Sequence, residues 1–338
     1  MPDAALDATL PYILIGASVG GVYAMLELAA ALPAGFPAPL LVVQHIGAHR
    51  SQLAELLSVR GANRAVVASD GQRPEAGTIY IAPPDHHMLV EQGAIRLTRG
   101  PKEHHARPAI DPLFRSAALD LGPRAVGVIL TGMLDDGSAG LQAIKQCGGI
   151  TVVQDPADAY EPSMPRAAIA ATEVDHVVSI AALPTLLLAL CEQVVATARP
   201  AARLPPRALQ EEHALSSGTL TMDDLKTIAR PSSFSCPDCG GVLFELDDRT
   251  PVRFRCHTGH AFSLASLASM LEEVTDFALW AALRAMREKE GVLRHLAASE
   301  GGRDRQVAAD CLAEADALAP AIAALCRLLL TTSDAHAR

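Results

Sequence analysis

A serine stands in a glycine-rich turn near the start of the chain, in the stretch Gly16-Ala17-Ser18-Val19-Gly20-Gly21. An apolar run precedes this turn and a helix-like pattern follows it, so the turn joins a strand to a helix. Such a turn can cradle a phosphate on the amides of the helix, or it can present a serine as a nucleophile. The two alternatives require different residues elsewhere in the chain.

Dinucleotide binding requires G-x-G-x-x-G and an acidic residue at the end of the second strand, which holds the ribose. Here Ala17 and Ser18 occupy the place where the second glycine would allow close approach of the phosphate. The second strand ends in Gln44-His45 rather than in an acid, and no P-loop lysine is present. These departures favour the nucleophile over the phosphate cradle.

A serine nucleophile needs a base, and the base needs a partner that orients it. Gly16-Ala17-Ser18-Val19-Gly20 fits the G-x-S-x-G pattern, His45 ends the next strand, and Asp136 follows a later strand in Thr131-Gly132-Met133-Leu134-Asp135-Asp136-Gly137. The carboxyl ends of parallel strands meet at one edge of a sheet, so the pattern predicts a catalytic triad of Ser18, His45 and Asp136. The competing interpretation is that these residues merely end strands or cap helices, since serine and aspartate are good N-cap types.

A second hydrolase arrangement would use Ser18, Asp136 and His176, in the chain order of α/β-hydrolases. In that fold the nucleophile turn follows several strands, whereas here only some fifteen residues precede it. His176 also lies within or at the start of an expected strand. Both observations disfavour this order.

Strand-like and helix-like runs alternate from residue 11 to about residue 198. The expected strands are 12–16, 39–44, 78–82, 125–131, 150–154 and 175–179, and the expected helices are 21–32, 50–58, 110–121, 138–147, 165–172 and 181–198. Short apolar strands separated by helices indicate a parallel sheet covered on both faces. We therefore predict an α/β fold with a doubly wound, mostly parallel sheet and a β-hairpin over 87–98.

The composition changes after the α/β segment. We expect a catalytic domain over 10–198, an extended linker over 199–232, a compact Cys/His module over 233–262 and a helical hairpin over 263–332. Leu264, Leu271 and Phe277 lie on one apolar stripe of the first terminal helix, which is expected to bury against the second helix, a partner or another copy of the chain.

The Cys/His module contains Cys236-Pro237-Asp238-Cys239 and, after sixteen intervening residues, Cys256-His257-Thr258-Gly259-His260. Two such turns, each with two soft ligands, can close a tetrahedral zinc site of the ribbon type. The expected ligands are Cys236, Cys239, Cys256 and His260, because His257 adjoins Cys256 and would reach the same ion less easily. A full set of four ligands favours structural over catalytic zinc, and the alternative is a set of buried thiols.

The bulk composition restricts the class of protein. The 28 basic residues against 38 acidic residues give a formal charge of −10, which argues against nucleic-acid binding. No apolar run reaches the length of a membrane span, and the start lacks the features of a secretory signal. With seven cysteines and no even framework of pairs, we expect a cytoplasmic protein without disulfides or membrane insertion, and the sequence leaves its oligomeric state open.

Six motifs in chain order resemble those of the chemotaxis receptor methylesterases, the CheB family. They are Ile15 to Gly21, Val42-Val43-Gln44-His45, Ile79-Tyr80-Ile81-Ala82-Pro83, Arg107-Pro108-Ala109-Ile110-Asp111, Val128 to Gly137 and Met164-Pro165-Arg166, within residues 12–190. The family hydrolyses methyl esters of glutamate side chains on chemoreceptors, and its members can also deamidate receptor glutamines.

The resemblance implies a role for each candidate residue. Ser18 would be the nucleophile, His45 the general base and Asp136 the residue that orients the imidazole, with no cofactor for catalysis. Met133 would lie beside the site with its amide toward the oxyanion, and Val19, Gly20 and Met164 would also line it. Methylated chemoreceptors would be the partner and substrate; a catalytically inactive scaffold and an esterase for small esters are the alternatives.

The chain departs from the family pattern in three places. Val19 stands where members often carry threonine, and Ala106 replaces a histidine of the usual His-Arg-Pro, with His104 and His105 just upstream. Typical members begin with a receiver domain, whereas the first strand here is expected by about residue 12. We therefore expect no control by phosphorylation of a built-in receiver.

Overall fold

The computed structural model describes residues 10–45, 51–197, 207–216, 222–247, 251–300 and 304–335. The chain divides into two compact units, Met1–Leu267 and Ala268–Arg338. The first unit contains the α/β sheet and the Cys/His module, and the second consists of two helices.

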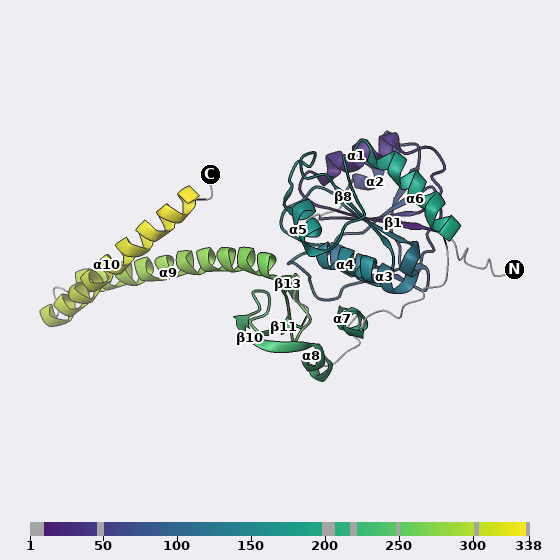
Figure 1. Ribbon diagram of the computed structural model, residues 1–338. Coiled ribbons are helices and arrows are strands. Elements are labelled where there is room, and N and C mark those ends of the chain that lie inside the picture. The colour runs from purple at the N-terminus through teal and green to yellow at the C-terminus, as the bar shows by residue number, and fades with distance from the viewer. Residues whose placement is uncertain are drawn as a thin grey trace. The chain divides into compact units, whose positions relative to one another are not determined.

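The first unit is built on a seven-stranded sheet in which every neighbouring pair is parallel (Figure 1). Its order is β3-β4-β2-β1-β7-β8-β9. The strands are β1 (Tyr12–Ala17), β2 (Leu40–Gln44), β3 (Arg64–Val67), β4 (Thr78–Ile81), β7 (Ala125–Ile129), β8 (Ile150–Gln154) and β9 (His176–Val178). The predicted α/β class is confirmed, and β3 is an edge strand that the sequence pattern did not reveal.

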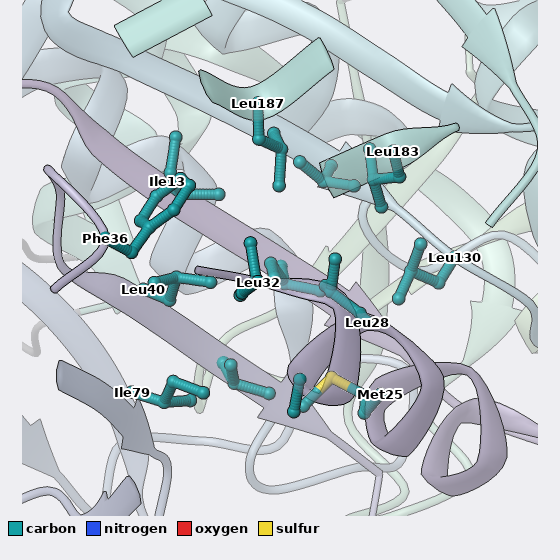
Figure 2. Close-up of a cluster of buried hydrophobic side chains, with 14 of the residues drawn as sticks. Ile13, Met25, Leu28, Leu32, Phe36, Leu40, Ile79, Leu130, Leu183 and Leu187 are labelled. Carbon is teal, nitrogen blue, oxygen red and sulfur yellow. The ribbon is translucent and has the colours of Figure 1, made fainter. Parts of the chain in front are cut away.

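The central strands are buried on both faces because helices cover the sheet on each side. Every residue of β1, β2 and β7 is buried, which explains their continuous apolar sequences. One face carries α1 (Gly21–Ala31), α2 (Leu53–Arg60) and α6 (Leu183–Thr197). Figure 2 shows the core between them, where Leu28, Leu183 and Leu187 pack with side chains of the strands.

The opposite face carries α3 (Ile110–Leu121), α4 (Ser138–Gln146) and α5 (Ser163–Ala171). The predicted hairpin is present as β5 (His87–Glu91) and β6 (Ala94–Thr98), and its apolar side chains join the same cluster as Phe114 of α3. This layer matters for the site because α3 begins beside the carboxyl edge of the sheet.

The strand order reverses direction at β1, which lies between β2 and β7. Ligands of open parallel sheets bind at such a switch point, beyond the carboxyl ends of the strands. The turns after β1, β2 and β7 therefore meet in the place where this fold carries its chemistry. The glycine-rich turn and the Asp135-Asp136 loop both lie there.

The C-terminal part of the first unit is more ordered than the composition suggested. Within the expected linker, the structure contains α7 (Arg207–Ser216), α8 (Met222–Ile228) and the start of β10 (Ala229–Ser235), while 198–206 and 217–221 lie outside the described residues. Leu209 of α7 joins the core beneath α3, and Glu212 is buried. These tertiary contacts order a segment whose polar sequence reads as a linker.

A four-stranded antiparallel sheet follows, in the order β10-β11-β12-β13. Its other strands are β11 (Val242–Leu246), β12 (Arg253–Cys256) and β13 (Ala261–Ser263). We call residues 229–263 the ribbon module. β11 and β12 form an antiparallel pair at its centre, with β10 and β13 as the outer strands.

The second unit is a pair of helices, most of α9 (Leu264–Glu300) and α10 (Arg305–Ala335). Lys289 pairs with Glu314 at 2.8 Å and Arg294 with Asp316 at 3.0 Å, so the two helices lie side by side. The stripe expected to be buried is only partly so, since Leu271 is half-buried and Phe277 is 76% exposed. Among the described residues, no helix is both long enough and apolar enough to cross a membrane.

Candidate active site

The backbone hydrogen bonds between neighbouring strands continue past the strand ends into the site. The amide of Ser18 donates to the carbonyl of Thr131 at 3.0 Å, and the amide of His45 donates to the carbonyl of Ala17 at 3.1 Å. The first residues beyond three adjacent strands are thereby held in register. Their side chains leave the sheet at the same edge.

The three predicted residues form one hydrogen-bonded chain. The Nδ1 atom of His45 lies 3.0 Å from the Ser18 hydroxyl, and its Nε2 atom lies 2.7 Å from Oδ2 of Asp136. When Nε2 carries the proton that it donates to Asp136, the Nδ1 lone pair faces the hydroxyl and can accept its proton. The site can therefore activate the Ser18 hydroxyl at the carboxyl edge of the sheet. The His45 side chain remains 22% exposed there.

The Asp136 carboxylate is buried at the start of α3. The amides of Ile110 and Asp111 donate to it at 2.7 and 3.0 Å, and these are the first two residues of the helix. A helix N-terminus stabilises an anion through its free amides and its dipole. Burial by itself would raise the pKa of Asp136, but the charge of His104, the hydrogen bond with His45 and these amides hold it well below its usual range.

The helix-capping interpretation fails for both residues. Gly20 is the N-cap of α1 and Gly137 is the N-cap of α4, and neither helix has a side-chain cap. Both glycines have positive φ, at 80° and 89°, a conformation that side chains disfavour. Ser18 and Asp136 are thus left to contact His45 and α3.

Three polar side chains that the sequence reasoning did not single out fix the turns around the triad. Gln44 donates to the carbonyl of Ser18 at 2.7 Å, and the Thr131 hydroxyl donates to the carbonyl of Val19 at 2.9 Å. Gln154 accepts a hydrogen bond from the Thr131 amide at 2.9 Å. The two glutamines end β2 and β8 after paired valines, so a polar residue at the end of a buried strand was the available signal.

The other predicted site residues lie in different environments. Val19 and Met133 are 41% and 54% exposed at the rim, and Gly20 sits where a Cβ would collide with Tyr160. Met164 is fully buried under Gly132, so it supports the site rather than lining its open face. Among the described residues, none accepts a hydrogen bond from the Met133 amide.

His176 does not join this group. It starts β9 and pairs with Val152 of β8, whereas Ser18 follows β1. With β7 and β8 between them, and strands about 4.8 Å apart, β1 and β9 are separated by three strand spacings. The alternative triad with His176 is therefore not assembled.

A second histidine contacts Asp136 from its buried side, and sequence reasoning noted it only as a neighbour of an altered motif. His104 places Nε2 3.1 Å from Asp111 and 3.7 Å from Asp136, and its side chain is 7% exposed. Burial alone would lower the pKa of His104, but the charge of Asp136, the hydrogen bond to Asp111 and the charge of Asp135 raise it to about 10. His104 is accordingly an imidazolium at neutral pH.

The four expected metal ligands converge in the ribbon module. The sulfurs of Cys239 and Cys256 are 3.7 Å apart, and Nδ1 of His260 lies 3.7 and 3.6 Å from the sulfurs of Cys236 and Cys256. A tetrahedral zinc with bonds of about 2.3 Å to sulfur and about 2.1 Å to nitrogen has ligand separations of about 3.6 to 3.8 Å. His257 is turned away and its ring covers Gly241, where a Cβ would lie 2.2 Å from it.

A parallel α/β sheet with a Ser-His-Asp chain at its carboxyl edge defines an α/β serine hydrolase. The chain belongs to the CheB methylesterase family, whose model matches residues 13–187. The ribbon module and both terminal helices lie beyond the matched segment.

Individual proteins agree with the family match. The chain is 38% identical over 180 residues to a putative protein-glutamate methylesterase/protein-glutamine glutaminase of Leptospira interrogans, covering 53% of this chain and 93% of that protein. It is 40% identical to the protein-glutamate methylesterase FrzG of Myxococcus xanthus, over 50% of this chain and 52% of that one. The crystal structure of the Thermotoga maritima CheB methylesterase catalytic domain superimposes with a TM-score of 0.52 at 31% identity, covering 54% of this chain and 98% of that one.

Proposed function

We propose that this protein is a serine hydrolase that removes methyl esters from glutamate side chains of methyl-accepting chemotaxis receptors. The observation that carries the proposal is the continuous chain from the Ser18 hydroxyl through His45 to the buried Asp136 carboxylate. Family membership and the names of the relatives supply the substrate class.

In the first step, the Ser18 oxygen attacks the ester carbonyl while Nδ1 of His45 takes the hydroxyl proton. The tetrahedral intermediate collapses to a glutamyl ester of Ser18, and His45 returns the proton to the departing methanol. Water then attacks the acyl group with His45 again as base, which releases the glutamate carboxylate and restores Ser18. A glutamine side chain would follow the same path with ammonia as the leaving group.

The oxyanion of the tetrahedral intermediate requires donors that are free in the resting enzyme. Within the described part of the chain the Met133 amide has no acceptor, and it lies in the turn after β7, next to Gly132, where a Cβ would be 2.8 Å from the Ser18 Cβ. We assign the Met133 amide to the oxyanion. All groups used are side chains, backbone amides and water, so the reaction needs no cofactor.

The test is methanol release from methylated receptor membranes. We expect Ser18→Ala to reduce release to the background rate, because no other nucleophile in the triad can replace the hydroxyl. Ser69→Ala, at an exposed serine after β3, serves as the matched control and should retain full activity. Undiminished release by the Ser18 variant would contradict the proposal.

The two alternatives give different results in the same experiment. An inactive scaffold would not react with a serine-directed fluorophosphonate probe, whereas an activated Ser18 would. A general esterase would react with the probe and hydrolyse simple esters, but would show no preference for the receptor.

We also propose that Cys236, Cys239, Cys256 and His260 bind one structural zinc ion, because their separations match a tetrahedral site. The ion would hold together the two turns of a module too small for a large core. Metal analysis should find about one zinc per chain. Cys236→Ser should lose it, while Cys311→Ser, at a half-buried cysteine of α10, should keep it.

A further inference from the structure

The ribbon module is joined to the loop that precedes α3. The His104 amide donates to the carbonyl of Ala261 at 2.8 Å, and the Ala261 amide donates to the carbonyl of Lys102 at 3.2 Å. These bonds add a short stretch of the loop to the edge strand β13. His104 and His105 both have positive φ, at 51° and 58°, which is uncommon for residues other than glycine and indicates that the surroundings impose this loop conformation.

A buried charge network reinforces this junction. Glu103 accepts hydrogen bonds from Arg115 of α3 at 2.6 Å and from Arg255 of β12 at 3.1 Å. Glu212 of α7 joins it by accepting from Arg253 at 2.5 Å. The side chains of this network are at most 8% exposed, so ion pairs shielded from solvent join the module to α3 and to the loop before it.

The start of α9 lies against the site through two serines. The Ser266 amide donates to the Ser263 hydroxyl at 3.0 Å, and the Ser263 amide donates to the Ser266 hydroxyl at 2.9 Å, which is the reciprocal pattern of a capping box. Beyond this cap, the Ser263 hydroxyl donates to Asp135 at 2.6 Å. The cap is therefore tied to the loop that carries Asp136.

Ser266 reaches the buried histidine. Its hydroxyl lies 3.1 Å from Nδ1 of His104, while Nε2 of the same ring lies 3.1 Å from Asp111. An imidazolium must place both N–H groups on acceptors, and these two contacts fix the plane and rotation of the ring. The fixed ring then faces Asp136 at 3.7 Å.

The charges around His104 explain why its position matters. Asp111 at the start of α3 and the loop residues Asp135 and Asp136 all face the ring, with Arg115 3.9 Å from Asp111 on the far side. His104, Asp111 and Asp136 could also be regarded as a metal-ligand group. However, both oxygens of Asp136 already accept amide hydrogen bonds, and the ring nitrogens are at hydrogen-bond distance from their acceptors.

We propose that the ribbon module and the first turn of α9 position the catalytic triad, with Ser266 orienting His104 and His104 holding Asp136. The inference rests on the proposed function, since it assigns positioning residues to the same triad. His104 and Ser266 are positioning residues, because they act on Ser18 and His45 only through Asp136.

The test compares Ser266→Ala with Ser269→Ala, the same substitution one turn later on α9, in the full-length protein. We expect Ser266→Ala to slow the labelling of Ser18 by a fluorophosphonate about 5- to 50-fold, and Ser269→Ala to leave it within about twofold. Where methanol release is measured, kcat should fall and KM should stay, since the interaction acts on the reaction rather than on receptor binding. Ser266→Thr, which restores a hydroxyl, should recover most of the rate.

A second variant provides a readout that simple loss of structure would not give. In His104→Gln the positive charge beside Asp136 is gone, so Asp136 attracts the proton on His45 more strongly. We expect the acid limb of kcat/KM, or of the labelling rate, to move to higher pH, together with about a 10- to 100-fold lower maximum.

Two results would overturn the inference: labelling of Ser266→Ala as fast as that of Ser269→Ala, or a lower rate in His104→Gln with an unmoved acid limb. Failure of the proposed function looks different. Wild-type protein would then react with the fluorophosphonate but release no methanol from methylated receptors, and the labelling comparison would still decide the inference.

Discussion

Two histidines contact Asp136 from opposite sides, and their surroundings differ. His45 is 22% exposed and contacts one carboxylate and the Ser18 hydroxyl, whereas His104 is 7% exposed and faces three carboxylates. The surrounding carboxylates keep a proton on His104, while His45 can release and recover one. Burial and charge thus distinguish two identical side chains on one carboxylate, for which we propose a catalytic and a positioning role.

The largest expected effect comes from replacing each of the two histidines with glutamine and comparing the losses of activity. His45→Gln should lower the rate of Ser18 labelling and of ester hydrolysis about 10⁴-fold, because no base remains for the hydroxyl proton. His104→Gln should cost one to two orders of magnitude, as expected for a residue that acts through another. Equal losses in the two variants would remove the distinction between them.

Asp136→Asn changes the partner that both histidines share. We expect kcat to fall about 10³- to 10⁴-fold, since the amide no longer fixes the productive tautomer of His45 or balances its charge in the transition state. Asp135→Asn is the matched control, because that residue contacts Ser263 and lies 3.9 Å from His104 without contacting His45. The fall in kcat of Asp135→Asn should stay within about tenfold. A fall as large as that of Asp136→Asn would show that both aspartates, and not Asp136 alone, support His45.

The buried charges that join the ribbon module to the loop before α3 should contribute to the stability of the folded protein. Arg255→Met should reduce the free energy of unfolding by about 3–5 kcal/mol, because Glu103 and Glu212 lose a buried partner. Arg230→Met provides the comparison on β10, where the arginine is 84% exposed and pairs with Asp247 at the surface. Chemical denaturation should give a change of at most about 0.5 kcal/mol for this control, and similar values for both variants would contradict the buried network.

The smallest effect is a dependence of stability on alkaline pH. The pKa of His104 is raised to about 10, so its stabilising contribution is complete below the ordinary value near 6.5 and is lost as the pH rises toward 10. The melting temperature of the wild type should therefore fall more between pH 7 and 9.5 than that of His104→Gln. Parallel curves for the two proteins would show that His104 carries no such linkage.

Much of the α/β domain was predictable because its strands are buried on both faces. Continuous apolar runs such as those of β1 and β7 distinguish themselves from the helices between them, and the hairpin at 87–98 alternates visibly. The edge strand β3 escaped because Arg64-Ala65-Val66-Val67 is short and half exposed. The helices α7 and α8 were not predicted because contacts with α3 and the ribbon module order them, whereas their own sequences show no clear helical pattern.

Some residues of the site were likewise predictable from the sequence and others were not. Ser18, His45 and Asp136 could be proposed from sequence because each lies in the segment after a strand, and parallel strands bring such segments to one edge. Gln44 ends a strand and Thr131 lies just after one, but nothing in a single sequence distinguishes a supporting amide or hydroxyl from an ordinary strand end. Met164 was placed in the lining by resemblance, and packing under Gly132 buries it instead.

By itself, the sequence determined what is local or periodic: the alternation of strands and helices, the turn that presents Ser18, and the spacing of the cysteines. Only the tertiary structure decided that His104 is charged, that Ser266 lies beside it, and that the ribbon module contacts the loop before α3. Ser266 is 162 residues from His104, and no pattern along the chain encodes such a contact. The physical reason is that burial and the electric field at a buried group depend on all segments that pack around it, whereas strand and helix patterns depend on neighbours in sequence.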